Sequence, residues 1–225
     1  MRAEASAPPR RFRLIVFDWD GTLADSTALI VFALREACRD LGVAIPDEAS
    51  ARHVIGLGLD DALGHVAPAV PPARYPELSA RYRHHFLSRD AQIPLFDGVR
   101  EMLVELEERG FLLAIATGKS RGGLTRALAQ QGIAGHFVAT RCADEGFAKP
   151  HPEMLLHLFA RTGVGPEETV MVGDTTHDLE LARNAGVAAL AVSYGAHPRA
   201  GLAQYAPLAL LDSPQALHRW LCANA

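Results

Sequence analysis

The chain has 225 residues, which suits one core domain with a smaller insert but is short for two full domains. It carries 22 basic and 26 acidic residues, so it lacks the basic excess expected of a nucleic-acid-binding protein. No apolar run approaches the roughly 20 residues that a membrane-spanning helix needs. We therefore expect a globular protein that binds neither nucleic acid nor membrane.

The N-terminal segment and the cysteines point to the cytoplasm. Residues 1–12 have no apolar centre of a secretory signal, and we expect them to form a short disordered tail. The three cysteines are far apart and odd in number, which argues against a disulfide framework or a metal site. A reducing, cytoplasmic location is the resulting expectation. Whether the protein is a monomer or a homodimer stays open.

Short apolar runs in alternation with helical patterns predict an α/β fold. The first apolar run is followed by a region, 25–92, that has helical patterns and no clear strand. Beyond it, a helix at 98–110 precedes a regular alternation of strands and helices. Strands that are apolar throughout are typical of a parallel sheet covered by helices on both faces. The predicted strands are 13–17, 111–117, 136–139, 169–173 and 187–193, and the later helices are 121–131, 152–162 and 177–185.

This pattern divides the chain into two parts. We expect residues 1–24 and 93–225 to form the core with its parallel sheet. Residues 25–92 are predicted to form a small all-helical insert after the first strand, since prolines separate their helical patterns.

Polar residues follow the predicted strands at their carboxyl ends, which is where open parallel sheets bind ligands. Acids follow the first and fourth strands, a Thr-Gly pair closes the second, and a lysine precedes the helix between the third and fourth. These residues are Asp18, Asp20, Thr117, Gly118, Lys149 and Asp174. We expect them to meet at one edge of the sheet.

The chemistry of this set points to a phosphoryl group and a metal ion. Asp18, Asp20 and Asp174 would repel one another unless a divalent cation neutralised them, and Mg²⁺ suits carboxylates that share it with a phosphate. The Thr117 hydroxyl, the backbone N–H groups after it and the Lys149 ammonium could bind an anion. Of the first two acids, one could attack phosphorus while the other protonates the leaving oxygen and then deprotonates water.

At these residues the sequence resembles the haloacid dehalogenase superfamily of phosphohydrolases, which has a Rossmann-like core. Four motifs occur in the family's order and span nearly the whole chain. They are DWDGT with a trailing DS at 18–26, ATG at 116–118, KP at 149–150 and GDTTHD at 173–178.

The resemblance implies a role for each acid. Asp18 would be the nucleophile and a metal ligand. Asp20 would be the general acid and base, with its backbone carbonyl also bound to Mg²⁺. Asp174 would be the third protein ligand of the metal, and Asp178 would support the metal's water or Lys149 from outside the metal shell.

The other motifs and the insert gain roles in the same way. Thr117 and the Gly118 amide would hold the phosphate, and Lys149 would balance charge around it. The insert is similar to the family's helical cap, which closes over the site and excludes water. The segment VIGLGLDDAL at 54–63 resembles phosphoglycolate phosphatases, which implies 2-phosphoglycolate as the substrate of a Mg²⁺-dependent phosphatase.

Other functions were weighed against this one. Asp20 argues against a dehalogenase, and the absence of lysine from 25–92 argues against a phosphonoacetaldehyde hydrolase. A sugar-phosphate mutase similar to β-phosphoglucomutase remains open, as does a regulatory protein without catalysis. The GKS run at 118–120 is not a P-loop, because Leu113 stands where that motif requires glycine. Lys119 is therefore expected near the rim of the site or on the surface.

Overall fold

The computed structural model describes residues 11–225. The tail expected at 1–12 lies outside these residues except for Arg11 and Phe12. Phe12 is only 1% exposed and packs in the core, so the expectation of a disordered tail was wrong for this residue. Burying a phenylalanine side chain contributes about 1.5–3 kcal/mol, so Phe12 stabilises its own segment against the core.

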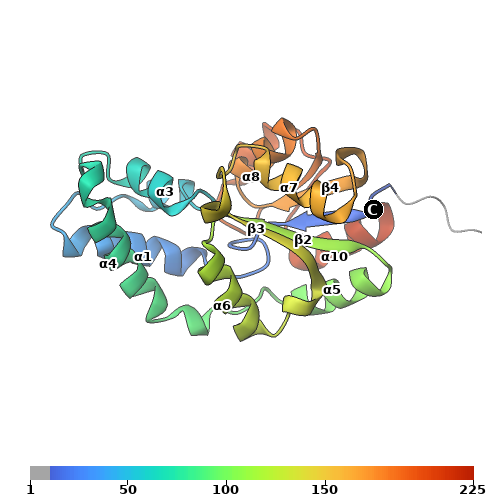
Figure 1. Ribbon diagram of the computed structural model, residues 1–225, viewed down its shortest axis with the longest axis horizontal. Coiled ribbons are helices and arrows are strands. Elements are labelled where there is room, and N and C mark those ends of the chain that lie inside the picture. Colours follow the sequence, from blue (N-terminus) through green and yellow to red (C-terminus); the bar gives the residue numbers. More distant parts are fainter. Residues whose placement is uncertain (1–10) are drawn as a thin grey trace, which may run out of the picture.

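Six parallel strands form the central sheet, in the order β3-β2-β1-β4-β5-β6 (Figure 1). The five predicted strands are all present, and a short sixth strand extends one edge. β2 and β3 lie on one side of β1, and β4, β5 and β6 lie on its other side. The direction in which strands are added to the sheet therefore reverses between β1 and β4. The bounds are β1 (Leu14–Phe17), β2 (Leu112–Thr117), β3 (Phe137–Cys142), β4 (Thr169–Gly173), β5 (Ala188–Val192) and β6 (Ala209–Leu211).

Helices cover both faces of the sheet because side chains of the central strands alternate between two apolar layers. Ile15 and Phe17 of β1 face one layer, and Leu14 and Val16 face the other. The first layer includes α5 (Val99–Glu108), α6 (Arg121–Gln131) and α10 (Pro214–Asn224), and the second includes α7 (Glu153–Thr162) and α8 (Thr176–Asn184). A five-residue helix, α9 (Arg199–Ala203), packs beside α8.

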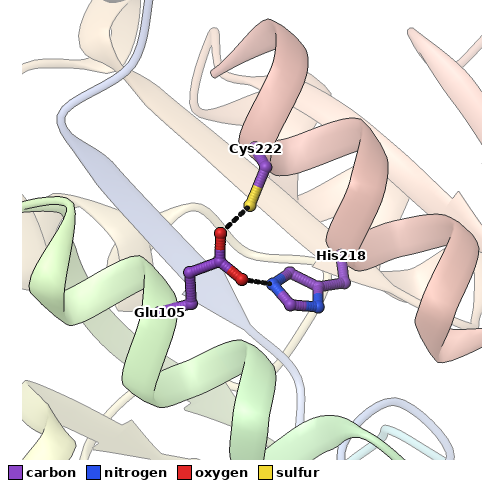
Figure 2. A group of neighbouring side chains, drawn as sticks. All are labelled: Glu105, His218 and Cys222. Carbon is purple, nitrogen blue, oxygen red and sulfur yellow. Dashed lines mark hydrogen bonds and ion pairs between the residues drawn. The ribbon is translucent and has the colours of Figure 1, made fainter.

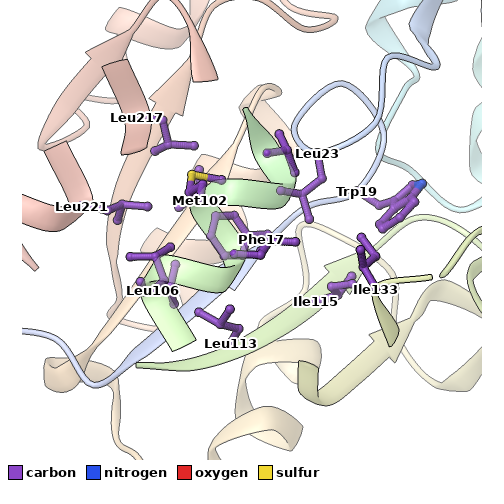
Figure 3. Close-up of a cluster of buried hydrophobic side chains, with 14 of the residues drawn as sticks. Phe17, Trp19, Leu23, Met102, Leu106, Leu113, Ile115, Ile133, Leu217 and Leu221 are labelled. Carbon is purple, nitrogen blue, oxygen red and sulfur yellow. The ribbon is translucent and has the colours of Figure 1, made fainter. Parts of the chain in front are cut away.

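The first layer holds most of the large core side chains (Figure 3). Phe17 of β1 and Leu113 of β2 lie under α5 and α10, which contribute Met102, Leu106 and Leu217. All five residues are at most 1% exposed. This dense packing holds β1 and β2 in place against the helices, and the candidate site lies beyond the carboxyl ends of these two strands.

Of the five α-helices between β1 and β2 in the chain, the first four pack mainly on one another. They are α1 (Thr27–Asp40), α2 (Glu48–His53), α3 (Leu59–Val66) and α4 (Tyr75–Leu87). Their core includes Leu34, Cys38, Leu63 and Leu78, and α1 packs along α4. Figure 1 shows α1, α3 and α4 together at one end of the molecule. We call residues 27–87 the helical insert.

The two segments that join the helical insert to the sheet run side by side. Ala24 forms an antiparallel bridge with Leu95. The Asp25 N–H donates to the Pro94 carbonyl at 3.0 Å, and the Phe96 N–H donates to the Leu23 carbonyl at the same distance. The helical insert therefore leaves and rejoins the core at a single place, next to the end of β1.

Candidate active site

The sheet order brings three of the four motifs together. β1 has β2 on one side and β4 on the other, so the residues after these strands share one edge. The Asp18 N–H donates to the Val172 carbonyl at 2.9 Å, which continues the strand pairing by one residue beyond β1. Asp18 is thereby held beside Asp174, the residue after β4.

Three carboxylates gather at this edge. Asp18, Asp174 and Asp178 each have an oxygen within 4.8 Å of the others, and all three side chains are buried. Burial raises the pKa of Asp18 to about 7, although the nearby ammonium of Lys149 opposes the shift. Burial and the neighbouring Asp18 carboxylate also raise the pKa of Asp174 well above its usual value. Without a further cation, the negatively charged forms of these carboxylates are therefore disfavoured.

One oxygen of the cluster has no hydrogen-bond partner. Asp18 Oδ1 accepts from Lys149 Nζ at 2.7 Å, whereas Asp18 Oδ2 is buried and unpaired. Leaving a buried acceptor unpaired costs about 1–3 kcal/mol, and more when it is charged. Hard oxygen ligands suit Mg²⁺, and the unpaired oxygen is free to bind a cation or attack phosphorus. The residues therefore fit the metal ion that the sequence implied.

Asp174 is fixed in a narrow space between glycines. Thr22 Oγ1 donates to one of its carboxylate oxygens at 2.9 Å, and the Ala196 N–H donates to the other at 2.7 Å. A Cβ atom at Gly21 or at Gly195 would lie 2.2 Å from Asp174 Oδ2. Gly21 also has a φ of +80°, a conformation that other residues rarely adopt. The DWDGT motif therefore needs its glycine to admit the Asp174 side chain.

Lys149 balances part of the negative charge. Its side chain is fully buried, with Nζ 2.7 Å from Asp18 and 2.6 Å from Asp178. Burial alone would lower the lysine pKa, but Asp178 and Asp18 outweigh it and raise the pKa, so the ammonium stays charged. Asp178 Oδ2 accepts from the backbone N–H and hydroxyl of Thr175, which also caps α8. The start of α8 thus positions Asp178, and Asp178 positions Lys149.

Asp20 lies apart from the other acids. Its carboxylate accepts from Ser26 Oγ at 2.6 Å and from Lys119 Nζ at 3.0 and 3.2 Å. Its carboxylate is not part of the three-acid cluster. Metal binding by its backbone carbonyl stays a prediction.

Lys119 contacts the site, so the alternative that it lies on the surface was wrong. Its side chain is 10% exposed, and its Nζ lies 4.8 Å from the centre of the Phe86 ring of α4. None of the four sequence motifs gives Lys119 a role. The signal that could have found it is composition, since Lys119 and Lys149 are the only lysines of the chain.

The end of β2 lies directly under the helical insert. Thr117 is buried, and its hydroxyl oxygen accepts from the Lys119 N–H at 3.2 Å. A Cβ atom at Gly118 would lie 2.5 Å from the carbonyl oxygens of Gly56 and Leu57. Only glycine admits this loop of the insert so close to β2. Phosphate binding by Thr117 and Gly118 stays a prediction.

A cavity of about 600 Å³ lies between the helical insert and the core, beside Asp20. This volume is typical of cavities that hold small ligands. Lys119 and Gly118 line its core side. Apolar side chains line much of the insert side, among them Ile30, Leu34, Tyr82 and Phe86.

Histidines tie the helical insert to the core. His177 and His197 of the core both have Nε2 within hydrogen-bond distance of the His53 carbonyl at the end of α2, at 2.8 and 3.0 Å. His197 Nδ1 accepts from the Thr176 N–H, which leaves Nε2 as the donor. Burial lowers the pKa of His197 to about 4 and also lowers that of His177, so both rings are neutral. They act here as hydrogen-bonding groups between the two parts.

A second group of potential metal ligands joins α5 to α10 (Figure 2). Glu105 lies 2.9 Å from His218 Nε2 and 3.5 Å from Cys222 Sγ. The same carboxylate accepts from Arg109 Nε at 2.9 Å. Burial raises the pKa of the Cys222 thiol, so it is not an activated nucleophile. We interpret this group as a structural contact that joins α5 to α10.

Within residues 11–225, none of the helices combines the length and apolar character needed to cross a bilayer.

Comparisons with known proteins agree with the four motifs. The chain is 36% identical to the probable phosphatase IndB of Dickeya dadantii, over 89% of each protein. It is 33% identical to a phosphoglycolate phosphatase of Vibrio cholerae, over 83% of this chain and 86% of that one. A crystal structure of a hydrolase from Pseudomonas syringae has the same fold, with a TM-score of 0.86 at 22% identity over 95% of this chain and 99% of the other.

The family itself is settled by a match that runs through the whole sheet except β6. The family model described as haloacid dehalogenase-like hydrolase matches residues 15–192, which include all four motifs and the helical insert. The resemblance seen in the sequence is thereby confirmed. This chain belongs to the haloacid dehalogenase-like hydrolase family.

Proposed function

We propose that the protein is a Mg²⁺-dependent phosphatase that hydrolyses a small phosphomonoester through an aspartyl-phosphate intermediate. The family and the phosphatases among its relatives support the reaction class. The observation that carries the mechanism is the buried, unpaired Oδ2 of Asp18, held beside the Lys149 ammonium.

Asp18 and Asp174 would hold the metal ion, together with the backbone carbonyl of Asp20. When bound, Mg²⁺ would neutralise the crowded carboxylates and draw negative charge from the phosphoryl oxygens. Lys149 keeps its contacts to Asp18 and Asp178 and adds a second positive charge beside the phosphate. The role of Asp178 is to hold Lys149 in place.

In the first step Asp18 Oδ2 attacks phosphorus, and the bond from phosphorus to the ester oxygen breaks. Lys149 fixes the other Asp18 oxygen, so the carboxylate presents a defined atom to the substrate. Asp20 gives its proton to the departing alcohol oxygen. Thr117 and the Gly118 amide bind the phosphoryl oxygens as they gain charge.

In the second step Asp20 takes a proton from water, and the water oxygen attacks the phosphorus of the aspartyl phosphate. Phosphate leaves and the Asp18 carboxylate is restored. Ser26 and Lys119 hold the Asp20 carboxylate in place for both proton transfers. The helical insert would exclude bulk water during the first step, since its loop lies against Gly118.

For the substrate, 2-phosphoglycolate is the first candidate. It is the substrate named for the Vibrio cholerae relative, and the cavity beside Asp20 has room for the glycolate part. A mutase would use the same two acids, so the products must be identified as well as measured.

The test is an assay of purified protein with 2-phosphoglycolate and a panel of phosphorylated metabolites, with and without Mg²⁺. We expect phosphate release that requires the metal, with the highest kcat/KM for a small phosphomonoester. Isomerised sugar phosphate formed in the presence of a catalytic bisphosphate would favour the mutase instead. If none of the substrates and no generic aryl phosphate is turned over, the protein is not a phosphatase.

A further inference from the structure

We propose that Lys119 recognises an acidic group on the alcohol part of the substrate, next to the carbon that bears the phosphate. The favoured substrate class is then the phosphate esters of 2-hydroxy acids. This inference rests on the proposed phosphatase function and concerns the leaving-group side of the site.

The position of the Lys119 ammonium carries the inference. Its Nζ contacts both carboxylate oxygens of Asp20, at 3.0 and 3.2 Å, and Asp20 is the group that would protonate the ester oxygen. In a 2-hydroxy acid ester the carboxylate carbon is two covalent bonds from that oxygen. A carboxylate in this position therefore falls beside Asp20, within reach of the same ammonium.

Lys119 can hold a second acceptor without releasing Asp20. An ammonium has three donors, and both of its described hydrogen bonds go to this one carboxylate. Asp20 also accepts from Ser26 at 2.6 Å, so its orientation does not depend on Lys119 alone. The Phe86 ring under the ammonium limits where the charge can move.

The other cations of the cavity are less suited to this role. Arg126 is bound to Asp90 at 2.7 Å, and Arg83 lies exposed on α4. Within residues 11–225, Lys119 is the cation that both lines the cavity and contacts a carboxylate of the proposed mechanism.

Acids elsewhere in the cavity narrow the choice of substrate. Asp60, Asp61 and Asp144 also line it and would repel a negative group placed far from Lys119. An acidic substituent is thus favoured next to the ester carbon and disfavoured farther along the alcohol. The apolar side chains Ile30 and Leu34 leave space for an uncharged substituent on the same carbon.

The experiment compares two substrates that differ in one charge. 2-Phosphoglycolate carries the carboxylate, and 2-hydroxyethyl phosphate has an uncharged hydroxymethyl group in its place. Steady-state kinetics with Mg²⁺ would be measured for the wild type, Lys119→Met and the charge-conserving Lys119→Arg. Arg13→Met is the matched control, since it removes an exposed cation at the opposite end of β1. Thermal unfolding would confirm that each variant is folded.

We expect the wild type to prefer 2-phosphoglycolate and Lys119→Met to lose about 10- to 100-fold of that preference, mainly through a higher KM for the acid. Lys119→Arg should keep most of the preference, and Arg13→Met all of it. Equal losses with both substrates would assign Lys119 to the positioning of Asp20 and overturn the inference alone, as would a wild type without preference. Lack of turnover of both substrates would overturn the proposed function together with the inference.

Discussion

Two groups of side chains in this protein could each hold a metal ion. They differ in ways that distinguish a metal-binding site from a structural contact between helices. Asp18, Asp174 and Asp178 form one group, and Glu105, His218 and Cys222 form the other. The first is fully buried and has a carboxylate oxygen without a hydrogen-bond partner, whereas in the second the atom without one is His218 Nε2. The second is partly exposed, and its carboxylate is shared among His218, Cys222 and Arg109.

The number of potential ligands in a cluster therefore does not by itself predict whether the cluster binds a metal ion. Burying carboxylates near one another costs free energy, which folding alone does not recover. Such a cluster is retained when a ligand restores the balance. The Glu105 group needs no such ligand, because its one carboxylate already has the positive charge of Arg109 beside it, whereas three carboxylates of the first group lie beside one lysine.

The largest effect is expected from Asp18→Asn. The substitution keeps the shape of the side chain but removes the nucleophile, so kcat with 2-phosphoglycolate should fall by at least about 1,000-fold. Glu105→Gln is the matched control, and its kcat should stay within twofold of the wild type. Appreciable turnover by Asp18→Asn would contradict the nucleophile assignment.

Metal binding should separate the two groups next. A ligand at 100 times its dissociation constant stabilises a protein by about 2.7 kcal/mol, which is about 5 to 10 °C in melting temperature for a chain of this size. Scanning calorimetry should show such a shift with Mg²⁺ for the wild type and for Glu105→Gln. Asp174→Asn should lose it, because the substitution removes one of the two proposed carboxylate ligands. If Glu105→Gln alone lost the shift, the metal would bind at the second group.

The buried histidines between the helical insert and the core are a third case. They test whether burial of a titratable group changes the stability of the fold at a place where no metal site is proposed. The pKa of His197 is lowered to about 4, whereas an unfolded histidine titrates near 6.5. The unfolded state therefore binds more protons between these values, and stability should fall as the pH drops from about 6.5 to about 4. The loss attributable to His197 is at most about 3 kcal/mol.

His197→Gln should flatten that part of the pH dependence, measured by urea unfolding at several pH values. His84→Gln, at an exposed position of α4, serves as the control and should keep the wild-type slope. An unchanged slope in His197→Gln would show that other groups cause the acid sensitivity.

The smallest effect is expected from Glu105→Gln on stability. The substitution weakens partly exposed pairs with Arg109 and His218, and solvent screens such pairs, so the free energy of unfolding should fall only slightly. Urea unfolding with and without Mg²⁺ should give the same small loss. A large loss of stability would mean that this group does more than join α5 to α10 by surface contacts.

Much of the fold could be predicted because the central strands are apolar on both faces. β6 was missed, since it has only three half-buried residues at the sheet edge. α2 has six residues that bury only Ala51, which is too few to give the helical periodicity that indicates a helix in a sequence. α10 was also missed, although Ser213 as N-cap and Pro214 at the first turn are signals that sequence analysis can use.

The gathering of Asp18, Thr117 and Asp174 could be predicted once the sheet was expected to be parallel, since residues that follow parallel strands share an edge. The pairing of Lys119 with Asp20 could not, because it depends on a side chain 99 residues away in sequence and on the ring of Phe86 beneath it. The contact of Gly118 with the loop at Gly56 likewise requires the position of the helical insert.

The paired segments at Ala24 and Leu95 bear on how this protein can be re-engineered. Because the excursion between them starts and ends at one point, a short turn could replace it without cutting any strand of the sheet. Such a shortened protein would keep the three buried acids and Lys149 on the sheet edge while leaving Asp20 open to solvent. It would offer a minimal scaffold on which foreign lids of different shape could be grafted.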